Sequence, residues 1–148
     1  MTQQTIDNSR TWTEDEYRNL TLIRQFHDAG TSIKALRDSG MLSDCIEWWV
    51  AGPRTLLPFS GTWLGPDGVA EFHRILGETM RYDKTELVEY IVGGDSVAAI
   101  FVGEGIARST GKSFHSQIMR LYTVKDGKIV RVRNFYDTAA YVAAVTGE

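Results

Sequence analysis

The second half of the chain contains four stretches that are predicted to form strands, the last of them alternating in polarity. They span residues 85–92, 97–107, 113–124 and 128–136. Between them lie glycine-containing sequences of the kind that favours tight hairpins: Gly93-Gly94-Asp95, Ser109-Thr110-Gly111 and Lys125-Asp126-Gly127. Successive strands joined by hairpins pair with their neighbours in antiparallel fashion. We therefore predict a curved antiparallel sheet over this half of the chain.

The first half carries helix signals. Thr13 followed by Glu16 is a capping box, and apolar residues then recur at helical spacing as far as Gly30. Helices segregated from an antiparallel sheet define the α+β class, here a sheet wrapped around three helices with a cone-shaped pocket between them. The remaining predicted elements are a helix over 32–40, a strand over 45–50, a helix after Gly65-Pro66-Asp67-Gly68 and a short terminal helix over 138–145.

Length and composition fit one globular domain. The chain has 148 residues, of which 43% are hydrophobic and 24% charged. Residues 1–12 lack periodicity and are predicted to form a flexible arm, and residues 13–148 are predicted to form the domain. The net charge of -3 and the lack of a basic stripe argue against nucleic acid as a partner. No apolar run has the length of a membrane span.

Cysteine and histidine usage narrows the chemistry. Cys45 is the single cysteine, so no internal disulfide can form, and we expect a cytoplasmic protein with Cys45 buried at the start of a strand. The three histidines lack metal-ligand spacing, and no glycine-rich phosphate loop precedes a helix. We therefore expect no metal and no nucleotide cofactor.

Three local patterns are more specific. They are Glu47-Trp48-Trp49-Val50-Ala51-Gly52-Pro53, Pro58-Phe59-Ser60-Gly61-Thr62-Trp63-Leu64-Gly65, and Asp126-Gly127-Lys128-Ile129 running on to Asn134-Phe135-Tyr136-Asp137-Thr138. With the order of elements over residues 15–145, they resemble the SnoaL-like polyketide cyclase and ketosteroid isomerase-like branch of the nuclear-transport-factor-two-like superfamily. Limonene epoxide hydrolase is a further relative. The resemblance implies a cystatin-like roll, a hydrophobic small-molecule substrate and a homodimer. It leaves the reaction open, because members isomerise, dehydrate, cyclise, hydrate or only bind.

The resemblance also implies which strand residues face the pocket. It places Asn134 on the inner face of the last strand, together with Val132 and Tyr136, because alternate strand residues share a face. The analogous phases place three groups inward on the other strands: Ser116, Ile118 and Arg120; Val102, Glu104 and Ile106; and Glu47 with Trp49.

This phasing yields an expected site. The residues assigned to catalysis are Glu104, Glu47, Arg120 and Asn134. The residues assigned to substrate binding are Trp49, Tyr136, His73, Phe26, Leu76, Ile118 and Ser116. Since buried charges need partners, an inward Arg120 is expected to pair with Glu104.

Asn134 departs from the pattern of limonene epoxide hydrolase, in which an acid at the matching position activates water. An amide cannot take a proton, so the base would be Glu104 or Glu47, with Asn134, Tyr136 or the Trp49 ring N–H as donors.

Three functions follow from the sequence. The first is a cofactor-free enzyme that acts on a hydrophobic, oxygenated small molecule by acid–base chemistry, as a cyclase, an isomerase or an epoxide-opening enzyme. The alternative is a non-catalytic module that holds a small ligand in the same pocket. The third is a structural dimer that uses the outward strand face with Arg131, Arg133 and Phe135.

Overall fold

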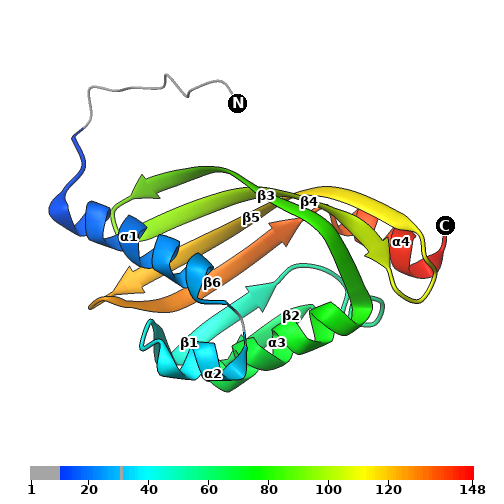
Figure 1. The fold of residues 1–148 in the computed structure, drawn as a ribbon, viewed down its shortest axis with the longest axis horizontal. Coiled ribbons are helices and arrows are strands. Elements are labelled where there is room, and N and C mark those ends of the chain that lie inside the picture. The colour runs from blue at the N-terminus through cyan, green and yellow to red at the C-terminus, as the bar shows by residue number, and fades with distance from the viewer. Residues whose placement is uncertain (1–10, 31) are drawn as a thin grey trace.

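The computed structural model describes residues 11–30 and 32–148 and confirms the α+β class (Figure 1). The predicted arm over residues 1–12 falls almost entirely outside this part of the chain. In chain order the elements are α1 (Glu14–Ala29), α2 (Ile33–Asp38), β1 (Leu42–Val50), β2 (Gly61–Leu64), α3 (Gly65–Thr79), β3 (Met80–Gly93), β4 (Ser96–Ala107), β5 (Ser113–Lys125), β6 (Lys128–Tyr136) and α4 (Thr138–Thr146).

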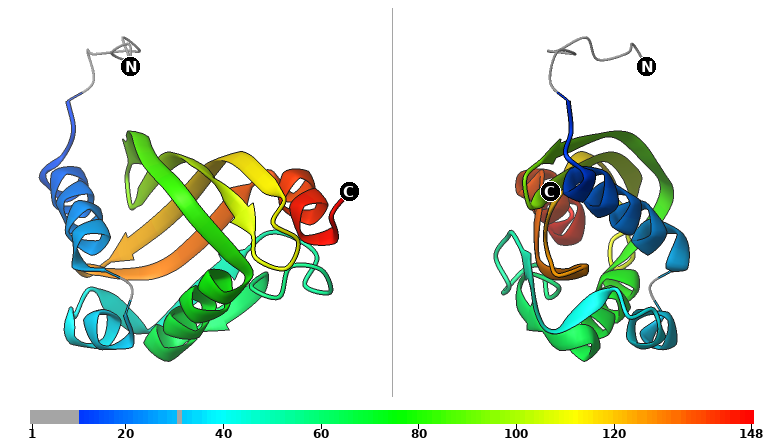
Figure 2. Two further views of the ribbon diagram at one scale, coloured as in Figure 1. Left: turned by 45° about the vertical axis from the view of Figure 1, so that its right-hand side comes forward. Right: turned by 90° about the vertical axis from the view of Figure 1, so that its left-hand side faces the viewer.

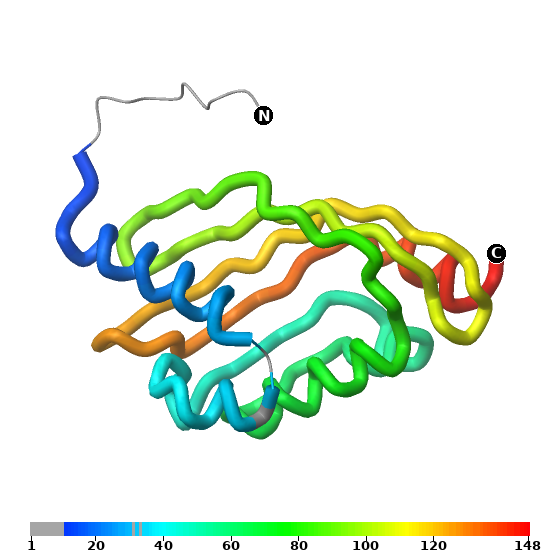
Figure 3. Tube along the Cα trace, in the orientation of Figure 1, coloured from blue at the N-terminus to red at the C-terminus, as the bar shows by residue number. Residues whose placement is uncertain are grey.

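The strands form one six-stranded sheet in the order β2-β1-β6-β5-β4-β3. The predicted hairpins join β3 through β6 into an antiparallel meander. The tube in Figure 3 shows β1 running beside β6, and this pair is parallel, so the sheet is mixed rather than wholly antiparallel. Residue patterns could not give this direction, because β1 and β6 lie far apart in the chain. The short edge strand β2 was not predicted.

The helices take the positions that their caps and apolar faces dictate. Thr13 and Glu16 form the predicted capping box of α1, and Asp137 caps α4 by accepting from the backbone N–H of Ala140 at 3.0 Å. The sheet curls so that its concave face is turned toward α1 and α3 (Figure 2). At the far end, α4 lies beside β4 and β5, where Thr110 donates to the carbonyl oxygen of Ala144.

The core fills the space between the concave face and the helices. Its largest fully buried side chains come from strands, helices and the loop after β1: Trp48, Tyr122, Tyr141, Phe59, Ile23, Leu36, Ile46 and Leu57. The expectation of a buried Cys45 is wrong. On β1 the alternating buried residues are Ile46, Trp48 and Val50, so the positions between them face outward.

The turn between β5 and β6 has the backbone that its sequence predicts. Asp126 and Gly127 both adopt positive φ angles, 51° and 74°. This combination is typical of a two-residue type I′ hairpin, whose twist matches that of the flanking strands. The turn thus joins β5 to β6. The register shifts once beyond it, between Thr123 and Val124, and Arg120 then lies opposite Asn134.

Gly103 and Gly105 allow β3 to approach β4 closely. Both lie on the concave face of β4 and are buried. A Cβ at Gly103 would lie 2.9 Å from Ile118 Cδ1 and 3.3 Å from the Tyr82 ring, and one at Gly105 would collide with the backbone carbonyl of Arg81. The register between β3 and β4 shifts next to this point, between Tyr82 and Lys84. The glycines thus bring Tyr82 over the sheet.

Replacing Gly105 with alanine should destabilise the protein by about 2 kcal/mol or more, because the added methyl group meets fixed backbone rather than a movable side chain. Gly93→Ala is the matched control, since nothing lies within 4 Å of a Cβ at that strand position. Urea unfolding of both variants measures the difference. Equal free energies of unfolding would contradict this view of the β3–β4 contact.

Candidate functional site

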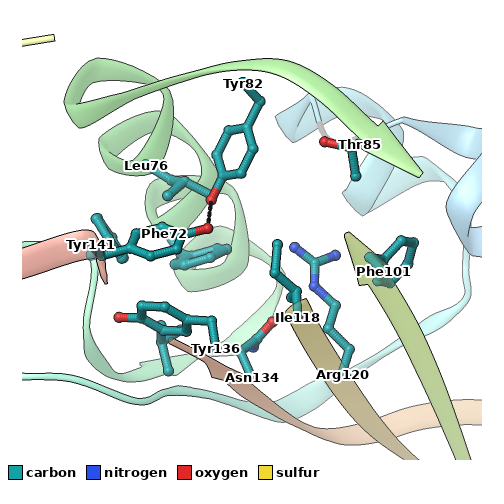
Figure 4. A pocket seen from close by; sticks show the side chains of 12 residues that line it. Phe72, Leu76, Tyr82, Thr85, Phe101, Ile118, Arg120, Asn134, Tyr136 and Tyr141 are labelled. Carbon is teal, nitrogen blue, oxygen red and sulfur yellow. Dashed lines mark hydrogen bonds between the residues drawn. The ribbon is translucent and has the colours of Figure 1, made fainter. Parts of the chain in front are cut away.

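A cavity of about 270 Å³ opens between the concave face of the sheet and α3. Figure 4 shows side chains from α3, β3, β4, β5, β6 and α4 converging on it. The lining is largely apolar and aromatic. The residues that line it are Val50, Phe59, Phe72, Leu76, Tyr82, Thr85, Phe101, Ile118, Arg120, Asn134, Tyr136 and Tyr141.

Arg120 is the only lining residue in the described chain that carries a formal charge. It stands on the inner face of β5, and its guanidinium carbon lies 5.1 Å from the centre of the Trp48 ring, a cation–π contact. Among the described residues no carboxylate lies within 4.0 Å of it, although exposed arginines such as Arg37 and Arg81 have such partners. The pocket therefore contains a cation without a counter-ion.

Two neutral histidines lie near this cation. His27 of α1 bridges two tyrosines, with Nδ1 at 2.7 Å from the Tyr90 hydroxyl and Nε2 at 2.8 Å from the Tyr122 hydroxyl. His73 of α3 donates from Nδ1 to the carbonyl oxygen of Val69 at 2.8 Å. Burial lowers the pKa of His27 to about 4 and that of His73 to about 3, and the charge of Arg120 lowers both further. The surroundings of Arg120 thus add no second charge at neutral pH.

Asn134 is held by backbone contacts rather than by a catalytic partner. It is 4% exposed, and its Nδ2 donates to the carbonyl oxygen of Trp49 at 2.9 Å. The main-chain carbonyl oxygen of Asn134 accepts from the N–H of Ala51 at 3.0 Å, and this bond ties β6 to the end of β1. With Nδ2 engaged, the side-chain oxygen is the end that faces the pocket (Figure 4).

Tyr136 presents its ring to the pocket but not a free hydroxyl. The hydroxyl donates to the carbonyl oxygen of Ala51 and lies 3.3 Å from Ser60 Oγ, which itself donates to the same carbonyl at 2.9 Å. Gly52 leaves room for this arrangement, since a Cβ there would lie 2.6 Å from the Tyr136 hydroxyl. Tyr136 therefore acts as a wall of the pocket and anchors the loop after β1.

Tyr82 and Tyr141 meet at another side of the pocket. Tyr82 comes from the start of β3 and Tyr141 from α4, and their hydroxyl oxygens are 2.7 Å apart. Burial raises the pKa of Tyr82 to about 12 and also raises that of Tyr141. Both hydroxyls are therefore protonated at neutral pH and serve as hydrogen-bond donors and acceptors.

The structure places five of the residues expected in the site on the pocket wall: Arg120, Asn134, Tyr136, Leu76 and Ile118. Three others pack beside it without lining it. Phe26 packs on Trp48 and Tyr122 in the core, and His73 makes edge-on ring contacts with Trp48 and Phe72. Ser116 accepts from the N–H of Asp137 at 2.9 Å.

Glu104, Glu47 and Trp49 face away from the pocket, so the inward placement expected for them is wrong. Both glutamates are exposed, and Trp49 is 36% exposed with its ring against Phe135. The strands explain why. Neighbours directly opposite in a sheet share a face, and Glu104 lies opposite the exposed His115. The expected pair of Arg120 with Glu104 does not form.

The same register argument applies to β1. Trp48 lies beside the inward Val132 of β6 and is buried, so Glu47 and Trp49 take the outer face.

Two buried ring nitrogens near the pocket, Nε1 of Trp48 and Nε2 of His73, lack a hydrogen-bond partner among the described residues.

Several lining residues were not predicted: Val50, Phe59, Phe72, Tyr82, Thr85, Phe101 and Tyr141. Phe72 shares a helix face with Leu76, four residues on, and could have been inferred from that spacing. Phe101 follows once β4 is phased on its glycines. Nothing in the sequence signalled Tyr141, which enters the pocket from the terminal helix.

The described residues offer no group of three or more His, Cys, Asp or Glu side chains placed to hold a metal ion. Within residues 11–30 and 32–148, no helix combines the length and apolar character that crossing a membrane requires.

Comparison with known proteins agrees with this architecture. A family profile described as SnoaL-like domain matches residues 39–132, from before β1 into β6. A protein of Dictyostelium discoideum, UPF0523 protein B, is 24% identical over 99 residues, which cover 65% of this chain. The match spans 60% of the length of that relative.

Solved structures show the same fold. An NTF2-like protein from Burkholderia thailandensis E264 has a TM-score of 0.73 at 26% identity, with 85% of this chain and 95% of that chain covered. A SnoaL-like polyketide cyclase candidate from Jannaschia sp. CCS1 has a TM-score of 0.76 at 16% identity, with 94% and 99% covered. TerC, crystallised with polyporic acid, has a TM-score of 0.68 at 22% identity, with 87% and 98% covered.

The two buried histidines should make the fold less stable in mild acid. Their folded-state pKa values lie below the ordinary value of 6.5, so between pH 6.5 and pH 4 the unfolded chain binds more protons than the folded protein. The free energy of unfolding should therefore fall as the pH falls through this window, as measured by urea unfolding.

The double variant His27→Gln/His73→Gln should lose less stability over the same window than the wild type. His115→Gln, at an exposed strand position, is the matched control and should keep the wild-type loss. The same loss in the double variant as in the wild type would show that the acid sensitivity arises elsewhere.

Proposed function

We propose that this chain, which belongs to the SnoaL-like domain family, binds a small apolar organic acid in its central pocket, with the anionic group against Arg120. One observation carries the proposal. Arg120 is the only charged side chain on the pocket wall of the described chain, and no described carboxylate lies within ion-pair distance of it.

The energetics of a partly buried cation favour this function. A charge removed from water is costly unless it is paired and hydrogen-bonded, and exposed arginines of this protein pair with carboxylates while Arg120 does not. A bound carboxylate would supply the missing partner, and guanidinium groups match carboxylates in a bidentate, charge-assisted contact. We therefore expect the Arg120 guanidinium to form an ion pair with the ligand carboxylate when the ligand enters the pocket.

The walls favour a carbon skeleton of low polarity. Phe72, Leu76, Phe101 and Ile118 face the cavity, and such surfaces gain free energy by covering apolar ligand atoms. The structural neighbour TerC was crystallised with polyporic acid. The likeness at 22% identity concerns the fold, so the ligand of this chain rests on Arg120 and the walls.

The second candidate function is catalysis in the same pocket. A cation in an apolar cavity can stabilise an oxyanion that develops during cyclisation or isomerisation, as well as a bound carboxylate. The base expected from the sequence is not at hand, because Glu104 and Glu47 are exposed on the outer face. Catalysis would then need a base supplied by the substrate or by water, so binding is the function that the described residues support more directly.

Binding of para-isopropylbenzoate tests the proposal, with para-isopropylbenzamide as the neutral analogue. The wild type should prefer the acid, and Arg120→Met should bind the acid at least about tenfold more weakly, since a charge-assisted hydrogen bond contributes about 1.5–3 kcal/mol. Titration calorimetry measures both.

Arg131→Met, at an exposed position on β6, is the matched control and should bind like the wild type. Equal affinity of acid and amide for the wild type would contradict an anion site. Recovery of the acid unchanged after incubation with the protein supports binding without turnover, and a new product would favour the second candidate.

Ligand binding should also raise the pKa of His27. The positive charge of Arg120 helps to lower that pKa in the free protein, and a carboxylate against Arg120 would offset the charge. Histidine NMR titrations with and without para-isopropylbenzoate measure the change. In Arg120→Met the free protein should already show a higher His27 pKa, and the ligand should add no further rise. An unchanged value in the wild type at saturating ligand would contradict contact between the acid and Arg120.

A further inference from the structure

We infer that the pocket has a second polar contact, the pair of hydroxyls on Tyr82 and Tyr141, and that it donates a hydrogen bond to a neutral oxygen of the ligand. The ligand class then becomes more specific: an organic acid with a ketone or similar acceptor oxygen at the end remote from its carboxylate. This inference rests on the proposed function, because it takes the carboxylate to be held by Arg120.

Counting hydrogens shows that the pair has a donor to spare. The two hydroxyls are 2.7 Å apart, so one O–H donates to the other oxygen. The hydrogen of the accepting hydroxyl is not used in that bond, and neither hydroxyl has another hydrogen bond with the described residues. Both side chains line the cavity, so the unused O–H is within reach of a ligand.

The other tyrosines near the pocket have their hydroxyls engaged. Tyr136 donates to the carbonyl oxygen of Ala51, and the hydroxyls of Tyr90 and Tyr122 both contact His27. Neutral His27 donates to one of the hydroxyls of Tyr90 and Tyr122, so that tyrosine also keeps an unused O–H, but neither residue lines the cavity. Among the tyrosines on the described cavity wall, the Tyr82–Tyr141 pair is therefore the one with an O–H to spare.

The position of the pair sets the shape of the ligand. In Figure 4 the paired hydroxyls lie on one side of Ile118 and the Arg120 guanidinium on the other. An apolar stretch of wall thus separates the two polar contacts. A ligand that meets both needs polar groups at its two ends and a carbon skeleton between them.

The chemistry of the pair selects a neutral acceptor. Burial raises the pKa of both phenols, so they donate hydrogen bonds rather than carry charge. No second cation lines the described pocket, so a second carboxylate at this end would be left without a counter-ion. A ketone oxygen accepts a hydrogen bond at little desolvation cost and fits better.

Two planar probes of similar shape test the inference. Para-acetylbenzoate has a ketone opposite its carboxylate, and para-isopropenylbenzoate replaces that oxygen with a CH2 group. The wild type should bind the ketone about fivefold more tightly, as one hydrogen bond of about 1 kcal/mol predicts. The double variant Tyr82→Phe/Tyr141→Phe should bind the two probes equally. Tyr17→Phe, at a 56% exposed position, is the control and should keep the wild-type ratio.

The ratio of the affinities for the two probes tests the tyrosine contact separately from the anion site at Arg120. If both probes bind in an Arg120-dependent way but with equal affinity, the inference is wrong and the anion site stands. If neither probe binds, both fall. Since the double variant could fail to fold, the infrared carbonyl stretch of isotope-labelled para-acetylbenzoate bound to the wild type gives a second readout. It should lie below its position in an apolar solvent, and an unshifted band would overturn the inference.

Discussion

The contact between Arg120 and Trp48 organises the centre of this protein. The guanidinium lies over the indole ring on the inner face of the sheet, where water is partly excluded and no described carboxylate neutralises it. A flat cation on an aromatic face is one of the few ways to keep an arginine in apolar surroundings without an acid. The Trp48 ring stabilises the Arg120 charge inside the protein. Because no described carboxylate pairs with it, the guanidinium can still attract an anion.

The surrounding elements keep this cation available. His27 from α1 and His73 from α3 approach it in neutral form, and each is fixed by hydrogen bonds that do not involve Arg120. The glycines of β4 let β3 close over the sheet, which brings Tyr82 to Tyr141 at the other side of the cavity. The fold thus places one charged contact and one neutral contact around an apolar space.

Much of this architecture could be predicted from the sequence. The hairpin turns between the predicted strands gave the meander, and the capping box gave the start of α1. The last two strands were also phased correctly, which placed Arg120, Ile118, Asn134 and Tyr136 on the pocket wall. Their phase came from the resemblance, which placed Asn134 inward, and the alternation of strand residues then gave its neighbours. It could not have been counted from the turn, because the register shifts between Thr123 and Val124.

The errors arose where register was unknown. Both Trp48 and Trp49 are apolar enough for the core, so hydrophobicity alone could not choose the inner face of β1, and the choice depends on pairing with distant β6. Glu104 and Ser116 were both expected inward, which the pairing of Gly103 with Ser116 makes impossible, because Glu104 and Gly103 point to opposite faces. Tyr141 depends on how the terminal helix docks, and local patterns do not contain that information.

The anion site proposed at Arg120 would bind the acid group of a small apolar ligand. A crystal structure of the protein with para-isopropylbenzoate is the decisive measurement. We expect carboxylate oxygens within hydrogen-bond distance of the Arg120 guanidinium and the hydrocarbon part among Phe72, Leu76 and Ile118. A ligand bound with its carboxylate away from Arg120, or bound outside this cavity, would contradict it.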